Sequence, residues 1–253
     1  MALQLCINIS RTSAHFAEVL RSTTSVEREE HLTFSSEKTE TIKEELNAFV
    51  KEKGFLKEYD EYSLAYWGDK YTIVPFNVFD SSNFNAVFQL CFGENNYNSN
   101  ELDYTTQPHL GVTSIYEMPH WIKSFFIIKF PRIIIQHGIS LQLNGMNSES
   151  NFRPNLHVHI EEGYFFLTLF KQTNLVFSNC FEFQNENDIA YHLVYMLKKM
   201  KVTEEDGQIN ISGKSKSLNL DTLIETLSTF TVISKFKKQI SEDRVLKHHL
   251  LCV

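Results

Sequence analysis

The part of this chain that most constrains its fold is residues 155–217, whose pattern predicts three strands, an amphipathic helix and a fourth strand. Strands are predicted where apolar residues alternate, the second over 164–170 and the third over 175–183. Polar residues at 185–188 can cap the free backbone N–H groups of a helix. The apolar residues of that helix recur at helical spacing: Ile189, Leu193, Met196, Leu197 and Met200. This order of elements predicts an α/β fold.

The beginning of the chain repeats this order more loosely. Residues 3–9 alternate as a half-buried strand, and two more strands are predicted at 14–20 and 29–34. A helix follows, which residues 35–37 cap and Gly54 ends. Both helices space their apolar residues by four and then three: Ile42, Leu46 and Phe49 in the first, Ile189, Leu193 and Met196 in the second. The chain is therefore predicted to be a two-fold duplication.

Two halves of this kind are typical of the actin, hexokinase and Hsp70 class of folds, in which each half resembles ribonuclease H. The polar residues 147–154 predict the crossing between the halves. We therefore expect residues 1–148 to form the first half and residues 149–253 the second. Each half should hold a mixed five-stranded sheet with flanking helices.

The first half is predicted to carry further elements after its helix. Residues 62–67 and 71–74 have strand patterns, and a two-residue turn at 68–69 favours a hairpin between them. A helix is predicted at 77–92 and a polar loop at 93–108.

Composition narrows the classes of function. A net charge of −7 argues against a nucleic-acid surface, which needs a concentrated excess of Lys and Arg. The start MALQLCINIS lacks the features of a signal peptide, and no apolar run approaches the roughly 20 residues that span a bilayer. We expect a cytoplasmic protein that does not insert into a membrane.

The four cysteines form no CxxC pair. Cys6, Cys91 and Cys180 lie among apolar residues, and we interpret them as small buried side chains.

Three segments resemble a known family: YTIVPFNVF at 71–79, NLVFSNCFEFQNENDIAYHLVYML at 174–197 and INISG at 209–213. On these segments the chain is similar, over nearly its whole length, to the uncharacterised bacterial family called domain of unknown function 3822. The resemblance implies an actin-like fold with two ribonuclease-H-like halves, and it implies no activity. The nearest functional analogy within the fold is to actin-like pilus-assembly proteins, which bind nucleotide and partner proteins.

Actin-like ATPases carry an aspartate and a glycine-rich turn after the first strand of each half, where backbone N–H groups meet phosphates and the carboxylate holds the magnesium shell. In the first half Asn8 stands where that aspartate belongs, and Ser10 and Arg11 stand where flexible glycines belong. In the second half Glu161 and Gly163 keep an acid and one glycine, but the turn is more typical of a plain hairpin. We therefore expect no ATP hydrolysis.

The adenosine of ATP lies in this fold against paired glycines after the fourth strand of the second half. Here that position reads Ser212, Gly213 and Lys214, which favours a plain strand-to-helix turn over a phosphate or adenine contact. If ATP with magnesium binds at all, the expected contacts are Glu161, Gly163, Ser212, Gly213 and Lys214.

Histidines offer no clear chemistry. His157 and His159 share a strand face with Glu161 and could make a three-ligand metal set, but alternate polar residues are common on exposed strands, and no metal site is predicted. His248 and His249 are interpreted as an exposed pair. The sequence nominates no catalytic residue.

Two classes of function stay open. The leading hypothesis is a catalytically silent actin-like module that binds a protein partner in a regulatory or assembly role. The alternative is a divergent ATP-binding protein of the actin, Hsp70 and pilus-assembly class.

Overall fold

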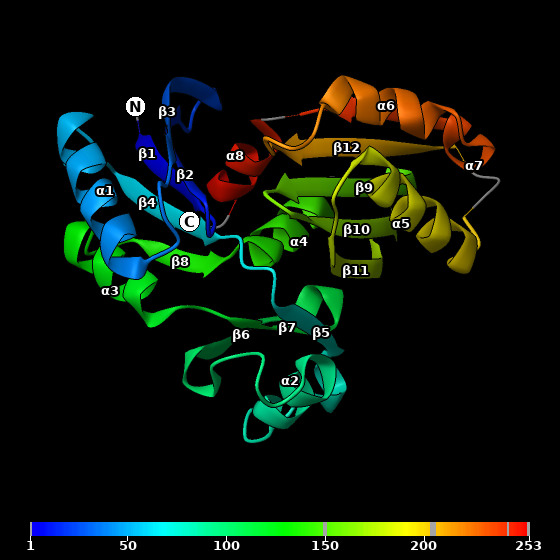
Figure 1. Ribbon diagram of the computed structural model, residues 1–253, viewed down its shortest axis with the longest axis horizontal. Coiled ribbons are helices and arrows are strands. Elements are labelled where there is room, and N and C mark those ends of the chain that lie inside the picture. The colour runs from blue at the N-terminus through cyan, green and yellow to red at the C-terminus, as the bar shows by residue number, and fades with distance from the viewer. Residues whose placement is uncertain (1, 149–150, 203–205, 242, 252–253) are drawn as a thin grey trace. The chain divides into compact units, whose positions relative to one another are not determined.

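The computed structural model describes residues 2–148, 151–202, 206–241 and 243–251 (Figure 1). These residues form two compact units. The first holds the described residues up to Gln107, those from Val112 to Gly145 and those from Leu246 onward, and the second holds Pro108–Gly111 and the described residues from Met146 to Val245.

The first unit contains a mixed five-stranded sheet of order β3-β2-β1-β4-β8. Its strands are β1 (Leu3–Ile9), β2 (Ser13–Leu20), β3 (Ser25–Thr33), β4 (Glu61–Tyr66) and β8 (Ile134–His137). The pairs β1–β2 and β2–β3 are antiparallel, whereas β1–β4 and β4–β8 are parallel. The chain therefore runs up and down through three strands before a helix returns it to the other side of β1.

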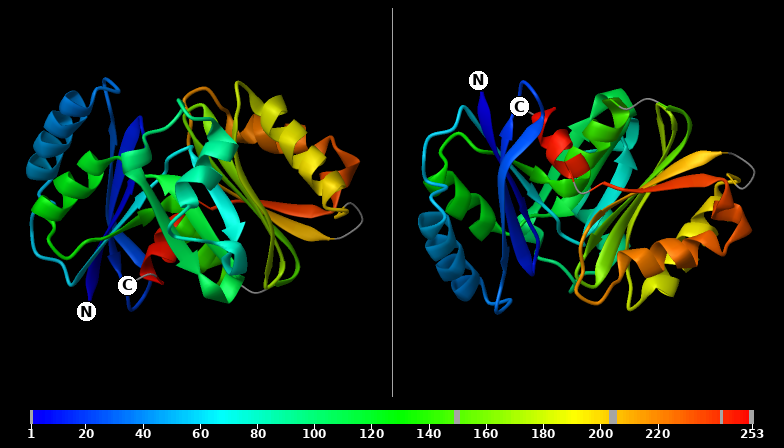
Figure 2. Two further views of the ribbon diagram at one scale, coloured as in Figure 1. Left: turned by 90° about the horizontal axis from the view of Figure 1, so that it is seen from below. Right: turned by 90° about the horizontal axis from the view of Figure 1, so that it is seen from above.

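Helices cover both faces of this first sheet (Figure 2). They are α1 (Thr39–Glu52), α3 (His120–Lys129), α4 (Gly138–Ser148) and α8 (Asp243–Leu250). On one face the ring of Phe16 from β2 contacts Phe49 of α1 and Phe126 of α3. On the other face Cys6 and Ala17 pack against Leu246 of α8. The first core thus consists of two apolar layers, one on each side of the strands.

The second unit repeats this topology with a sheet of order β11-β10-β9-β12-β13. Its strands are β9 (Asn151–Glu161), β10 (Tyr164–Gln172), β11 (Asn174–Glu182), β12 (Gly207–Gly213) and β13 (Phe236–Ile240), and its helices are α5 (Glu186–Lys199), α6 (Leu220–Ser228) and α7 (Thr231–Ser234). Again the first three strands pair antiparallel, and the fourth and fifth pair parallel. The two predicted mixed five-stranded sheets with flanking helices are confirmed.

Helix α5 begins as its sequence predicts. Asn185 and Asp188 form a capping box. The Asn185 side chain accepts the backbone N–H of Asp188, and the Asp188 carboxylate accepts the backbone N–H of Asn185. The predicted apolar face is buried in the second core, and its members are Ile189, Leu193, Met196 and Leu197.

A small sheet of order β5-β7-β6 is inserted in the first unit. It consists of β5 (Tyr71–Pro75), β6 (Leu102–Gln107) and β7 (Val112–Glu117), accompanied by α2 (Phe84–Phe92) and the short 3₁₀ helices η1 (Phe76–Val78) and η2 (Ser99–Glu101). A further 3₁₀ helix between β6 and β7, η3 (Pro108–Leu110), groups with the second unit. We call the residues from Tyr71 to Gln107 together with β7 the insert.

The insert overturns three sequence predictions. The predicted hairpin of 62–67 with 71–74 is wrong, because β4 pairs with β1 and β8 while β5 pairs with β7. The helix predicted at 77–92 is limited to α2, and the polar loop predicted at 93–108 contains β6. Ser63, Leu64 and Ala65 are fully buried, so β4 lies inside a sheet, and no local pattern distinguishes that position from a hairpin.

Two further details differ from expectation. Helix α1 starts at Thr39, with Lys38 at its N-cap and not the polar residues 35–37. Of the cysteines interpreted as buried, Cys6 is buried but Cys91 is exposed on α2.

The predicted division after residue 148 stays a prediction, and the residues from Leu246 onward group with the first unit although they were expected in the second half. Among the described residues, no helix combines the length and apolar character needed to cross a bilayer.

Candidate functional site

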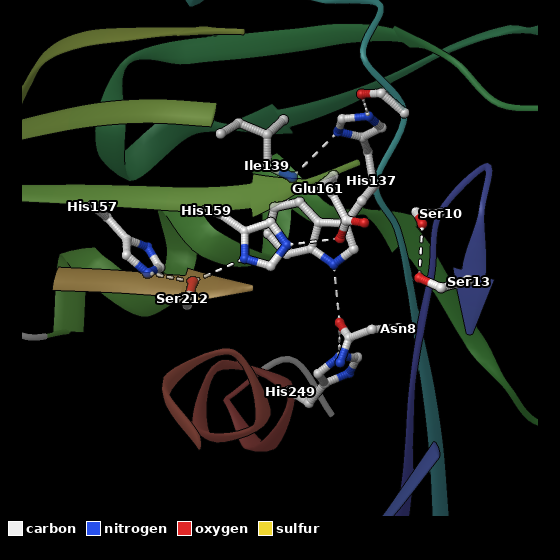
Figure 3. Close-up of polar contacts among 12 residues, drawn as sticks. Asn8, Ser10, Ser13, His137, Ile139, His157, His159, Glu161, Ser212 and His249 are labelled. Carbon is white, nitrogen blue, oxygen red and sulfur yellow. Dashed lines mark hydrogen bonds and ion pairs between the residues drawn. The ribbon is translucent and has the colours of Figure 1, made fainter. Parts of the chain in front are cut away.

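The end of β1 carries Asn8, whose side chain is held by two donors (Figure 3). The indole N–H of Trp67 donates to Asn8 Oδ1 at 3.0 Å, and His249 Nε2 lies 3.1 Å from the same oxygen. Because Trp67 can only donate, the bonded atom must be the amide oxygen, and His249 must also donate to it.

This assignment orients a buried chain of hydrogen bonds. His249 Nε2 carries the proton, so its Nδ1 accepts from the Ser63 hydroxyl at 2.7 Å, and that hydroxyl accepts from Gln4 Nε2 at 2.9 Å. Burial, helped by the charges of His248 and His15, lowers the pKa of His249 to about 3, which keeps its ring neutral. The position expected to hold a magnesium ligand therefore serves here to attach α8 to the sheet.

The interpretation of His248 and His249 as an exposed pair is wrong. Both side chains are buried, with exposed fractions of 1% and 0%. They lie on α8, and burial follows from the packing of that helix on the sheet, which the sequence of the last residues did not reveal.

The turn between β1 and β2 is closed by its own groups. The Ser10 N–H donates to the Ser13 carbonyl at 2.9 Å, and the two hydroxyls lie 3.1 Å apart. Arg11 is exposed and lies 3.9 Å from the carboxylate of Glu37. These serines are thus engaged with each other and hold a tight hairpin.

In the second unit, the turn between β9 and β10 is the expected hairpin, with Glu161 paired to Tyr164. Gly163 has φ of +83°, and a Cβ placed on it would meet nothing within 4 Å. Glycine is needed at this position only for its backbone angle.

The neighbouring residue Glu162 bonds the turn that follows β12. Its Oε2 accepts the backbone N–H of Lys216 at 2.8 Å and the hydroxyl of Ser215 at 3.1 Å. Ser215 Oγ in turn accepts the backbone N–H of Ser217 at 3.2 Å. The Glu162 carboxylate therefore accepts hydrogen bonds from two donors of the turn that follows β12.

Gly213 has a packing reason of its own. Its φ is +81°, and a Cβ there would lie 2.0 Å from the carbonyl oxygen of Ile160. The glycine lets β12 approach β9, as a plain strand-to-helix turn requires, and Lys214 next to it is exposed.

The structure joins Ser212 to the predicted acid through His159, and His157 is a second partner of the same hydroxyl. Ser212 Oγ lies 3.0 Å from His157 Nε2 and 2.9 Å from His159 Nδ1, and His159 Nε2 lies 3.1 Å from Glu161 Oε1 (Figure 3). Both nitrogens of His159 are engaged in this chain of contacts. Of the five residues predicted to contact ATP, Ser212 and Glu161 are thus joined through His159. Gly163 lies in the turn after β9 and Lys214 in the turn after β12, and Glu162 bonds the second of these turns.

Sequence reasoning missed one group of side chains that could ligate a metal ion. Among the described residues, His15, Glu29 and His31 are placed so that one potential ligand atom of each lies within 4.8 Å of the others. They lie on two paired strands, and only strand pairing brings them together.

Comparisons with known proteins place the fold. A family model described as "Protein of unknown function (DUF3822)" matches residues 2–233. A structure from Bacteroides thetaiotaomicron, described as a protein with actin-like ATPase fold and unknown function, is 15% identical, with a TM-score of 0.78 over 99% of this chain and 96% of that one. No curated protein sequence matches the chain significantly.

Two other solved structures share the fold. The PilM-PilN type IV pilus biogenesis complex includes a chain that is 9% identical, with a TM-score of 0.63 over 98% of both chains. The ethanolamine utilization protein EutJ from Carboxydothermus hydrogenoformans is 7% identical, with a TM-score of 0.54 over 99% of this chain and 89% of that one. The predicted actin-like α/β fold is confirmed.

Proposed function

The chain belongs to the DUF3822 family of proteins of unknown function, and we propose that it is a catalytically silent actin-like module that acts by binding a protein partner. One observation carries the proposal that the module is silent. The Glu162 carboxylate accepts hydrogen bonds from two groups of the turn after β12.

Glu162 opposes phosphate binding in two ways. It occupies the Lys216 N–H and the Ser215 hydroxyl, which a phosphate oxygen would otherwise accept from. It also carries a negative charge, and two like unit charges about 4 Å apart repel by roughly 4 kcal/mol at an effective dielectric constant of about 20. A nucleotide would have to displace this carboxylate before it could bind.

Asn8 supports the same proposal from the first unit. An amide cannot replace the full negative charge that holds a magnesium shell, and its oxygen already accepts from Trp67 and His249. Phosphoryl transfer depends on a positioned metal ion that neutralises developing charge, so turnover is not expected.

The partner role is supported by the insert and by one relative. The structure of that relative is a complex of PilM with PilN, so this fold can act in a protein assembly. On the insert, Phe76, Val78 and Leu90 are 48%, 68% and 87% exposed. Phe76 and Val78 lie on η1 and Leu90 on α2, and large exposed apolar side chains are candidates for protein contacts. We propose an apolar segment of a partner protein as their ligand.

Calorimetry with ATP and magnesium, followed by a phosphate-release assay, tests the silent half of the proposal. We expect no binding heat and no release above background. Release that disappears in Glu161→Ala would instead support the divergent ATP-binding protein, with Glu161, Gly163, Ser212, Gly213 and Lys214 as its contacts.

The binding half is tested by crosslinking the protein in its native host extract and comparing two variants. Leu90→Asp should lose the crosslinked species, because it places a charge on the insert. Leu56→Asp makes the same change at a side chain that is 51% exposed outside the insert, and it should retain the species. Equal crosslinking of both variants would remove the insert as the partner surface.

A further inference from the structure

Strands β2 and β3 bring two histidines face to face. His15 and His31 are direct partners in the antiparallel register, and their rings stack with centroids 4.0 Å apart and planes 4° apart. Glu29 precedes His31 by two residues, so it lies on the same face of β3. Its Oε2 is 3.3 Å from His15 Nε2.

These distances suit a metal ion. Zinc holds imidazole nitrogen and carboxylate oxygen at about 2.0 to 2.2 Å, so two ligands of a tetrahedral site lie roughly 3.3 Å apart. The separation of His15 and Glu29 already has this value. The third ligand belongs to the exposed side chain of His31, which has room to rotate into place.

The pairing of β2 with β3 fixes the relative positions of the three residues. All three residues lie on one hydrogen-bonded strand pair, so their Cα positions are set before any ion arrives. The stacked rings of His15 and His31, with centroids 4.0 Å apart, bring two imidazoles together on this strand pair.

We propose that His15, Glu29 and His31 bind one divalent transition-metal ion, with zinc as the preferred occupant and one coordination position left open. Imidazole and carboxylate together suit zinc, whereas magnesium and calcium prefer sites made of oxygen atoms only. The three residues belong to the first unit and are not part of the insert, so the proposal does not rest on the proposed partner role.

An ion pair between His15 and Glu29 would explain the same geometry without a metal. Such a pair at the surface adds little to stability, and it needs no contribution from His31. The dependence on His31 therefore separates the two explanations.

Isothermal titration of the tag-free protein with zinc chloride tests the proposal. We expect one zinc ion per chain and no binding of magnesium at the same concentrations. His31→Ala should weaken zinc binding by at least about tenfold, the lower end of what even outer-shell partners of a metal contribute. His31 is exposed, so its replacement should leave the fold intact.

Glu29→Gln has a matched control in Glu27→Gln. Glu27 lies on the same strand and is also exposed, so each variant removes one negative charge from β3. Only Glu29→Gln should weaken zinc binding. Equal weakening in both variants would mean that general surface charge attracts the ion, and it would overturn the proposal.

Cys91→Ser provides a second control, because an exposed thiol also binds zinc. Loss of zinc binding in Cys91→Ser with no loss in His31→Ala would overturn the proposal. In wild-type protein, zinc should shift the imidazole NMR signals of His15 and His31 and leave that of the exposed His120 unchanged. Zinc binding with no shift of these two signals would contradict the site.

Discussion

Two buried histidines show how single residues hold the first unit together. His249 bonds Asn8 and Ser63, and His137 Nε2 donates to the Gly68 carbonyl at 3.0 Å while its Nδ1 accepts the Ile139 N–H at 3.2 Å. Burial lowers the pKa of each ring to about 3. Each ring is thus a neutral connector with one donor and one acceptor.

The stability of the protein should therefore fall as the pH is lowered below about 6.5. In the unfolded chain both rings have pKa values near 6.5 and bind protons that the folded state excludes down to about pH 3. Each ring then contributes a slope of about 1.4 kcal/mol per pH unit within that window, with stability lost toward acid. Urea unfolding at pH 7 and pH 5 measures the loss. NMR titration checks its origin: titration of the His137 or His249 ring near pH 6.5 would contradict the prediction.

The two turn glycines should respond differently to alanine. Gly163→Ala meets open space and should cost about 1 kcal/mol for the left-handed backbone alone. Gly213→Ala adds an overlap with the Ile160 carbonyl and should cost more than about 2 kcal/mol. Denaturant midpoints of the two variants decide, and equal losses would mean that β12 does not approach β9 this closely.

At the scale of elements, α5 combines a local start signal with a buried face. The capping box at Asn185 sets where the helix begins, and Leu193 on its inner face is fully buried. Tyr191, two residues earlier, is 62% exposed. One helix thus offers both a core position and a surface position for comparison.

Leu193→Ala should destabilise the protein by roughly 2 to 5 kcal/mol, because it removes buried methyl groups and leaves a cavity. Tyr191→Ala on the same helix should change the free energy of unfolding by less than about 0.5 kcal/mol. Both values follow from urea midpoints. A small effect of Leu193→Ala would mean that α5 does not pack on the second sheet.

At the scale of the whole molecule, described residues near both ends of the chain belong to the first unit. After β13 in the second unit, the residues from Leu246 onward belong to the first, where Leu246 packs against Cys6, Ala17 and Val19. Helix α8 therefore completes a core formed by β1 and β2, which precede it by more than 200 residues in the sequence.

A chain that ends after Ser241 should expose Cys6. In the full chain Cys6 is buried and burial raises its pKa to about 12, so a thiol reagent should label it slowly. Without α8 labelling should be at least about tenfold faster, since both access and thiolate fraction increase. The exposed Cys91 is the internal control, and Leu246→Ala is a milder variant should the shortened chain not fold. An unchanged rate for Cys6 in both variants would contradict the packing of α8 on this face.

The sequence by itself determined the fold class and, outside the insert, the repeated order of three strands and a helix. Strand alternation and helical spacing are local properties, so 155–217 predicted its strands and α5, and the repeated order predicted two mixed sheets. The hairpin geometry of Gly163 was predictable for the same reason, because a turn depends on neighbouring residues.

Only the tertiary structure decided which distant groups meet. The pairing of β4 with β8, the burial of His249 against Asn8, the bond of Glu162 to the turn after β12 and the approach of His15 to His31 each join residues separated in sequence. No local pattern encodes such a contact, because it depends on sheet order and on how helices pack. The fold could therefore be predicted from local sequence patterns. The contacts that these distant side chains make could not, because they depend on long-range packing.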